Sequence, residues 1–506
     1  MQNDKYIKII EYILWVMLLV WVFVYSYNIY MEIKSPILNE YREYANVDCV
    51  LNFLNGRNSF TLNAPDISYF PYGPLFPWIC SLVYRLLPWN ADVMTYMRVM
   101  SHLCTIGVAC IAFKEILKES NSKIWASIGA CVSMMSACYF GYYCTAFCNE
   151  FGVLLMCLAL YYARRVDNVK RVWGLAFLSV LCFFAKQYFL VVLVPVFIYF
   201  LFRQYKLALW YFVSCTILLI LSVVIVWFIW PLYFQESFTH HVKVSSFVFE
   251  HMTNQWRFFH GQFMIFVWCA LGLFAIASRK IIELKKNKER IEFNIYAVSI
   301  VVYSIVLLKL GGHIGTFMTY YHQILLVPLV IYVCCYIPKK IDSLYIKYLL
   351  CFFLIVLSMY RAFGFTKSFL WHDEVDKCKE YYRLSGDIEK NKNSMVLLTP
   401  LLDRQALERN WTILNMGETE YLIMLHSDNR MFRIAERKAC IGDSLLSEEC
   451  DKLRNASYNL VVSDSKTDEY LIADSIISRR YEKYDSLNCN SVDTQIYLWR
   501  RKKITE

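Results

Sequence analysis

The sequence predicts an α-helical polytopic membrane protein with about 11 transmembrane helices, followed by a small C-terminal domain of mixed α/β structure. Three observations predict this class. Hydrophobic residues make up 58% of the 506-residue chain and charged residues 19%, whereas soluble domains have roughly 45–50% and about 25%. Apolar runs long enough to cross a bilayer recur between residues 9 and 363. After residue 363 the apolar runs shorten and the charge density rises.

The apolar runs define the candidate spans of a membrane domain over residues 1–363. They fall at 9–30, 98–117, 124–146, 150–164, 172–189, 190–202, 207–231, 259–278, 293–312, 317–337 and 346–363. The runs between 150 and 202 are short, so their boundaries are the least defined. The first run lacks a small-residue cleavage site, and we interpret it as a span that stays in the protein.

Lysine and arginine gather in alternate loops, and this bias predicts the orientation. If the N-terminus is cytoplasmic, the basic loops 114–123, 164–171, 203–206, 279–290 and 338–347 all lie inside, as the positive-inside rule expects. The opposite loops near 147–149 and 311–316 contain no Lys or Arg. With eleven spans the C-terminal domain is then extracytoplasmic. The net charge of +10 is distributed over these short loops, so we expect membrane lipid and not nucleic acid as a partner.

The first outer loop, residues 31–97, is far longer than a connector of a few residues. It contains Glu40, Arg42 and Glu43, and on a helix the two glutamates would share a face. A carboxylate at a membrane surface can be tuned by desolvation or pairing, which suits a base that accepts a proton from a hydroxyl. A solvated loop with incidental charges fits the same spacing. The segment 70–78, rich in Pro and aromatic residues, predicts an amphipathic helix that runs to residue 87. This helix either lies on the outer leaflet or forms a short re-entrant segment.

The C-terminal region, residues 364–506, predicts a small mixed α/β domain outside the membrane. Strand-like segments fall at 395–398, 459–462 and 494–499, and helical patterns fall at 373–391 and 467–479. This region contains no motif that indicates a function.

Polar residues cluster at the outer ends of the ninth and tenth spans. Lys309, Gly312 and His313 are followed by Tyr321 and Gln323. Polar residues at membrane depth are functional candidates, and glycine allows a backbone to approach a ligand closely. We therefore expect this cluster to contribute to a site at the outer face.

The sequence assigns no nucleotide site and no metal ligands. It contains no P-loop and no Rossmann fingerprint. His240, His241 and His251 lie in the 232–258 loop without a fixed carboxylate partner, so a metal site there is not predicted. Whether a divalent cation assists the chemistry stays open.

These features together resemble the GT-C glycosyltransferase superfamily. A first span is followed by a long outer loop with an acidic residue before Asn55-Gly56, and then by Tyr72-Gly73-Pro74-Leu75-Phe76-Pro77. The branch that it resembles, similar to bacterial glycosyltransferase family 39, uses polyprenyl-phosphate sugars. It includes protein O-mannosyltransferases and aminoarabinose transferases of lipid A. The resemblance implies an inverting transfer of one sugar from the lipid carrier to a glycan, lipid or protein acceptor on the extracytoplasmic face.

The resemblance also assigns residues to the catalytic role. Glu43 best matches the catalytic acid of the outer loop, but Arg42-Glu43 stands where many members have Asp-Glu, so Glu40 remains a contender. Glu150 would match the Asp of an Arg-Pro-Asp element, although the preceding Arg and Pro are missing. An acid at that position is also stabilised simply by the dipole of the helix that it opens.

The other implied roles concern the carrier phosphate and the substrate pocket. Lys186-Gln187 resembles a Lys-Gln element of the family, and Lys186 lies on the side that is poor in positive charge. Such a lysine either pairs with an anion such as the phosphate or snorkels to the interface. Cations near the leaving phosphate lower the barrier, and the candidates are Lys186, Lys309, Arg257 and His313. The substrate pocket is expected to include Tyr72, Glu150, Gln187, Tyr321 and Gln323.

Three other classes of membrane protein fit the sequence less well. A transporter or flippase would show two-fold symmetry with broken helices in matching positions, and none is visible. An O-antigen polymerase or ligase usually has its large functional loop late among the spans, whereas here it follows the first. A structural scaffold leaves the polar residues at the outer face unexplained. A transferase should bring Glu43, Lys186 and Gly312–His313 together at one outer site.

Overall fold

The structure is a computed structural model of the whole chain. It describes residues 2–34, 43–54, 56, 60, 72–86, 93–137, 144–231, 233–234, 237, 267–275, 294–310, 322–371, 395–398, 455–457, 459–464, 480–489 and 494–502.

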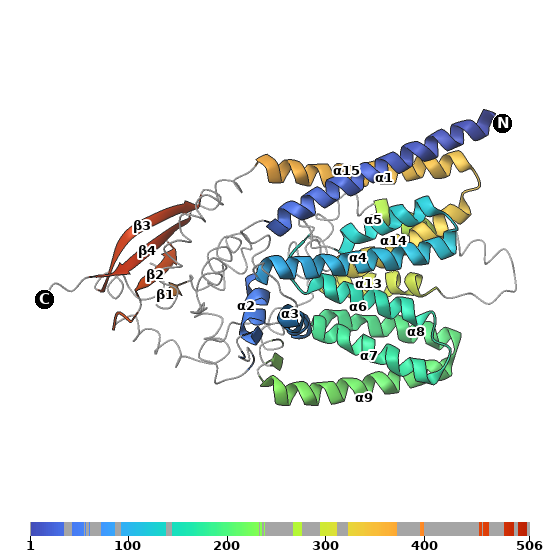
Figure 1. Cartoon of the computed structure of the whole chain (residues 1–506). Helices are drawn as coiled ribbons and strands as arrows, with labels where there is room; N and C mark the ends of the chain where they lie inside the picture. The colour runs from blue at the N-terminus through green and yellow to red at the C-terminus, as the bar shows by residue number, and fades with distance from the viewer. Residues whose placement is uncertain are drawn as a thin grey trace.

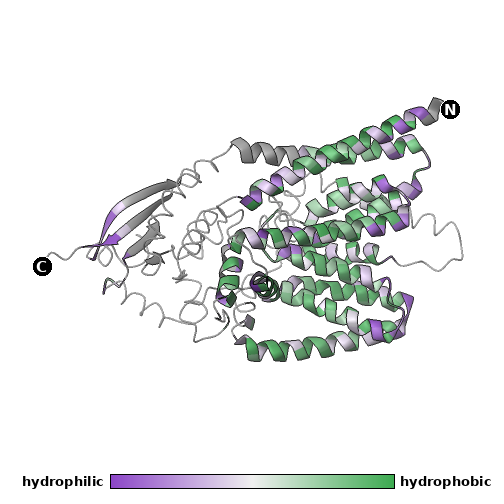
Figure 2. Cartoon of the chain, in the orientation of Figure 1, coloured by the Kyte–Doolittle hydropathy of each residue, from purple (hydrophilic) through white to green (hydrophobic). Residues whose placement is uncertain are grey.

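Long apolar helices lie side by side and form the body of the molecule (Figure 1). Hydrophobic residues predominate along these helices, as Figure 2 shows. The helices are α1 (Gln2–Lys34), α4 (Val93–Ser120), α5 (Lys123–Ala137), α6 (Asn149–Ala163), α7 (Val169–Ala185), the 3-10 helix η1 (Gln187–Val192), α8 (Leu193–Arg203), α9 (Tyr205–Ile229), α13 (Ile295–Leu310), α14 (His322–Lys340) and α15 (Leu344–Trp371). Residues 267–275 are also helical.

Four of the described helices are long and apolar enough to cross a membrane by length and composition: Lys5–Lys34, Val93–Ser120, Tyr205–Ile229 and His322–Lys340. The other apolar helices are shorter, so the number of eleven spans stays a prediction. The chain is nevertheless a polytopic helical membrane protein, because several apolar helices expose large hydrophobic side chains around the outside of the bundle. α14 differs in that nearly all of its side chains are buried, so it forms the centre of the bundle.

Two predicted span boundaries are wrong. The span expected at 124–146 ends at Ala137, and residues 144–148 are not helical. The span expected to reach residue 189 ends at Ala185, because Lys186 adopts an extended backbone and η1 begins after it. Both differences place non-helical backbone at the same end of the bundle, next to the outer-loop helices described below.

Two short helices of the first outer loop cover one end of the bundle. α2 (Glu43–Leu54) and α3 (Leu75–Leu86) pack against each other, and α3 is seen end-on in Figure 1 while the long helices run across the view. Arg85 of α3 donates to the carbonyl oxygens of Phe53 (2.5 Å) and Leu54 (3.1 Å). A cation on the last carbonyls of a helix stabilises its C-terminus, so Arg85 fixes α3 across the end of α2. The predicted amphipathic helix is therefore present, although it begins at Leu75.

The C-terminal region contains a four-stranded sheet with the order β1-β2-β4-β3. β1 (Met395–Leu398) pairs in parallel with β2 (Leu460–Asp464), and β4 (Thr494–Arg501) pairs antiparallel with both β2 and β3 (Tyr481–Cys489). The three predicted strands are found, and β3 was missed because its charged and polar residues hide the alternation. The helical patterns predicted at 373–391 and 467–479 lie outside the described residues. Tyr484 packs against the hydrophobic cluster that includes residues of α2, so the sheet and the outer helices meet.

Candidate functional site

A buried ion pair connects the outer loop to the membrane bundle. Glu43, the first residue of α2, accepts from Arg98 of α4 through both carboxylate oxygens, with Nε to Oε1 at 3.0 Å and Nη2 to Oε2 at 2.7 Å. Both side chains are fully buried. Arg98 also donates through Nη1 to the carbonyl oxygen of Glu32 at the end of α1 (2.8 Å). A bidentate guanidinium fixes the position of a carboxylate as well as neutralising its charge, so Glu43 has one defined place in the fold.

The carboxylates of Glu43 and Glu32 hold the non-helical segment 144–148. The backbone N–H of Ala146 donates to Glu43 Oε1, and that of Cys144 donates to Glu32 Oε2, both at 2.5 Å. Ser101 of α4 donates to the carbonyl oxygen of Phe147 (3.0 Å). These contacts replace the helical hydrogen bonds that this apolar segment would otherwise make.

Lys186 approaches this segment from the other side. Its Nζ donates to Asn149 Oδ1 (2.9 Å) and lies over the rings of Phe147 (4.3 Å), Tyr72 (4.6 Å) and Tyr188 (5.3 Å). The side chain is buried. Aromatic faces attract a cation electrostatically within about 6 Å of the centroid, so the three rings stabilise the ammonium where water is excluded.

Gly73 explains why Tyr72 reaches Lys186. A Cβ at Gly73 would lie 2.0 Å from the carbonyl oxygen of Phe184 and 2.5 Å from that of Ala185. Only glycine allows the turn before α3 to come this close to the C-terminal end of α7. The turn thereby brings Tyr72 over the ammonium that follows α7.

Glu150 and Gln187 line the same region. Glu150, in the first turn of α6, is buried and accepts from Thr145 Oγ1 (3.2 Å). Gln187 donates through Nε2 to the hydroxyl oxygen of Tyr233 (3.3 Å). Burial raises the pKa of the neighbouring Cys148 thiol to about 12, so that thiol is protonated at neutral pH and is not a nucleophile.

The structure therefore gathers Glu43, Tyr72, Glu150 and Lys186 around residues 144–150, with Gln187 next to Lys186. Gln323 is at the start of α14, where its Nε2 donates to the carbonyl oxygen of Ala137 (2.7 Å). Lys309 lies in the last turn of α13. The predicted residues Glu40, Arg42, Arg257, Gly312, His313 and Tyr321 fall outside the described part of the chain.

Sequence reasoning missed Glu32, Arg98 and Asn149. Arg98 had a usable signal, since an arginine at the start of an otherwise apolar span is expensive and marks a pairing or functional position. The sequence gives no comparable signal for Glu32 or Asn149, because a polar residue at the end of a span is common.

The described residues contain no group of three or more His, Cys, Asp or Glu side chains that could hold a metal ion. His240, His241 and His251 lie outside them. Glu43 already accepts from the guanidinium of Arg98 and from one backbone N–H, that of Ala146, and no chemical step is assigned to a metal.

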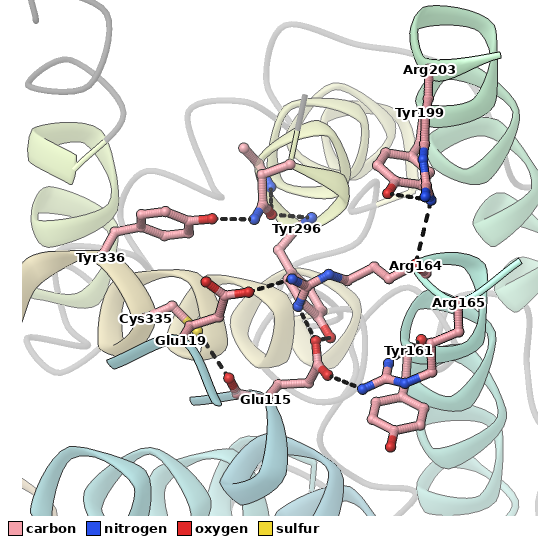
Figure 3. A network of polar contacts seen from close by, with 12 residues as sticks. Glu115, Glu119, Tyr161, Arg164, Arg165, Tyr199, Arg203, Tyr296, Cys335 and Tyr336 are labelled. Atoms are coloured by element: carbon pink, nitrogen blue, oxygen red, sulfur yellow. Dashed lines mark hydrogen bonds and ion pairs between the residues drawn. The ribbon is translucent and has the colours of Figure 1, made fainter. Parts of the chain in front are cut away.

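A second charged network, drawn in Figure 3, lies near the other end of α4 from Arg98. Glu115 of α4 is fully buried and pairs with Arg164 and with Arg165 (2.7 Å), and it accepts from the Tyr296 hydroxyl (3.2 Å). Arg164 and Lys339 also pair with Glu119, at 2.5 and 3.2 Å. The network joins the ends of α4, α6, α13 and α14. Its residues lie in or contact four of the predicted inner loops, 114–123, 164–171, 203–206 and 338–347.

The class of protein follows from these elements. A bundle of apolar helices, with two short helices and a polar site at one end and a small sheet in the C-terminal region, aligns with solved proteins of the GT-C fold, and this chain has that fold.

Two solved proteins share it at low sequence identity. ArnT from Cupriavidus metallidurans bound to undecaprenyl phosphate aligns with a TM-score of 0.63 at 10% identity, over 96% of this chain and 97% of that one. The apo form of the same protein aligns with a TM-score of 0.60 at 10% identity, over 98% of each chain. The Archaeoglobus fulgidus oligosaccharyltransferase in complex with Zn and sulfate gives 0.51 at 10% identity, over 96% of this chain and 72% of that one. No family model and no curated protein matches the sequence.

Proposed function

We propose that this protein is an inverting glycosyltransferase that moves a single sugar from a polyprenyl-phosphate carrier to an acceptor on the extracytoplasmic face. The observation that carries the proposal is end-to-end similarity to a structure of ArnT with bound undecaprenyl phosphate, covering 96% of this chain. The similarity includes the membrane bundle and the C-terminal region alike. An acceptor of glycan, lipid or protein type is equally compatible with the fold.

The proposed reaction needs a proton acceptor and a cation. The acceptor hydroxyl attacks the anomeric carbon and loses its proton to a carboxylate, while the bond from that carbon to the phosphate oxygen breaks and the carrier phosphate leaves with the electron pair. Glu43 is the proposed proton acceptor, fixed by Arg98. Lys186 is the proposed cation for the phosphate, because charge builds up there in the transition state.

The arrangement of these two residues supports the assignment. Glu43 and Lys186 approach residues 144–150 from different elements, one through Ala146 and the other through Phe147 and Asn149. A carboxylate and a cation on neighbouring parts of one segment suit a reaction in which a proton leaves one substrate and a negative charge appears on the other.

The orientation is part of the proposal. The basic loops 164–171, 203–206 and 338–347 lie at the end of the bundle with the Glu115 network, as the contacts of Arg164, Arg203 and Lys339 indicate. If that end is cytoplasmic, the positive-inside rule puts the Glu43 and Lys186 end outside.

A transfer assay tests the function directly. Protein in nanodiscs is given a panel of polyprenyl-phosphate sugars and candidate acceptors, and the products are measured by mass spectrometry. We expect one donor to be consumed with release of polyprenyl phosphate, and Glu43→Gln to lower the rate by roughly 10²–10⁴-fold, the range for a general acid–base group. Asp167→Asn is the matched control, because Asp167 is an exposed acid at the opposite end, where it pairs with Arg171 and accepts from Asn168 Nδ2.

Two results would contradict the proposal. If no polyprenyl-phosphate sugar is turned over with any acceptor, the donor class is wrong. If Glu43→Gln transfers sugar as fast as the wild type and the Asp167→Asn control, the donor class stands but Glu43 has no part in proton transfer.

A further inference from the structure

Asn149 lies where three parts of the site meet. It is the first residue of α6, follows the segment 144–148, and is fully buried. Its Oδ1 accepts from Lys186 Nζ at 2.9 Å and lies 3.5 Å from the hydroxyl of Tyr188. The side chain is therefore part of the polar site and not of the apolar core.

The amide nitrogen of Asn149 has no hydrogen-bond partner in the described part of the chain. The orientation of the amide is fixed by chemistry, because an ammonium group only donates and the atom that faces it must be the oxygen. The nitrogen is then a buried donor without an acceptor. Buried donors in native proteins almost always have a partner, so an exception needs an explanation such as a ligand.

The surroundings of this donor suit an oxyanion. Lys186 supplies a positive charge next to it, and the rings of Tyr72, Phe147 and Tyr188 keep water away from that charge. Position 149 is also the start of a 15-residue helix, whose first N–H groups and dipole favour a negative charge. The opposing charge is Glu150, whose Oε1 accepts from Thr145.

We propose that Asn149 Nδ2 and Lys186 Nζ form a two-donor subsite for a phosphate oxygen of the lipid-linked donor. The proposal rests on the proposed function, and it adds a binding residue that works together with Lys186. Asn149 holds the lysine through its oxygen and binds the phosphate through its nitrogen. A free phosphate ion has the same chemistry as the carrier headgroup, so the experiment must separate the two sources.

Asn149→Asp tests the proposal with a change of nearly identical shape. Aspartate keeps the acceptor for Lys186 but replaces the donor by a negatively charged oxygen. Dissociation constants are measured in nanodiscs for undecaprenyl phosphate, undecaprenol and inorganic phosphate. We expect Asn149→Asp to weaken binding of undecaprenyl phosphate by about tenfold or more, the size expected for losing a hydrogen bond to a charged group. Undecaprenol binding should not change, because the isoprenoid lacks the anion.

Two further variants separate ligand binding from folding. Asn168→Asp is the matched control: it is also an asparagine at a helix start, but it is exposed at the other end of the bundle, where its Oδ1 caps Arg171 N. Aspartate is an equally good cap there, so undecaprenyl phosphate binding should be unchanged. If Asn149→Asp does not fold, Asn149→Ala removes the donor without adding charge and should still weaken binding several-fold.

The outcomes are distinguishable. Wild-type binding of undecaprenyl phosphate together with unchanged binding by Asn149→Asp and Asn149→Ala would overturn the subsite and leave the proposed function intact. Wild-type protein that binds undecaprenyl phosphate no better than undecaprenol would overturn both. If inorganic phosphate competes with the carrier in the wild type but not in Asn149→Asp, the subsite recognises the phosphate itself. If it competes equally in both, the phosphate binds elsewhere and the subsite is refuted.

Discussion

The buried pair of Glu43 and Arg98 allows the catalytic and structural roles of one carboxylate to be separated. Three variants suffice: Glu43→Gln, Arg98→Met, and the double variant. Arg98→Met leaves the Glu43 carboxylate without its two guanidinium bonds, and Glu43→Gln leaves the guanidinium without its carboxylate. The double variant removes both charges, so that neither is left behind.

The expected magnitudes follow from the burial of both side chains. Removing one partner of a fully buried ion pair costs about 3–5 kcal/mol, because an uncompensated charge remains away from water. Replacing both partners by neutral groups of similar size is often close to neutral. We therefore expect each single variant to lose about 3 kcal/mol or more of unfolding free energy, and the double variant to recover most of that loss.

The assay combines unfolding and transfer on the same preparations. Unfolding free energies are measured in mixed micelles of dodecylmaltoside and SDS by tryptophan fluorescence, and sugar transfer is measured in nanodiscs. The double variant should be folded yet inactive, because it lacks the proposed proton acceptor. A double variant as active as the wild type would refute the catalytic role of Glu43. Single variants that each cost less than about 1 kcal/mol would refute the reasoning on the buried pair. The exposed pair Asp167–Arg171 provides the control, and its loss should cost roughly 0.5 kcal/mol or less.

Three further predictions concern other parts of the molecule. Glu115→Gln should lower the unfolding free energy by about 1.5–3 kcal/mol in the same assay, since it removes the charged acceptor of Arg165, which is partly exposed, and an unchanged unfolding free energy would contradict the structure. Gly73→Ala should lower the affinity for undecaprenyl phosphate, because its Cβ would displace the turn from Phe184 and move Tyr72 from Lys186; unchanged binding would show that the turn tolerates the shift. The Cys148 thiol, with its pKa raised to about 12, stays protonated below that pH, so maleimide should not modify it between pH 7 and 9 in the folded protein, and mass spectrometry of peptides would detect an adduct that contradicts this.

The helices were predictable because apolar runs of the right length have few alternatives in a bilayer. The predicted span boundary was wrong where an apolar segment is not helical. Residues 138–146 are nearly as apolar as the span before them, so hydropathy extends the helix through them. Residues 144–148 are non-helical, and their contacts are tertiary: the carboxylates of Glu32 and Glu43 accept the N–H groups of Cys144 and Ala146, and these acceptors are far away in the sequence.

The candidate site was predictable only in part, for a related reason. Glu43 lies in the long loop after the first span, and Glu150 and Lys186 lie near the ends of predicted spans, so these charges are visible in the sequence. The residues that these side chains contact could not be identified from the sequence. The importance of Asn149 depends on Lys186, 37 residues further along the chain, and that of Arg98 depends on Glu43, 55 residues before it. Neither pairing follows from spacing on one helix.

The two charged clusters of α4 have a consequence for the membrane that surrounds the protein. Arg98 and Glu115 lie nearly five turns apart on this helix, which is about 25 Å at a rise of 1.5 Å per residue. The hydrocarbon core of a typical bilayer is about 30 Å thick. Because Arg98 and Glu115 are both fully buried and paired within the protein, the stretch of α4 between them can lie within a bilayer core without exposing either charge to the lipid tails.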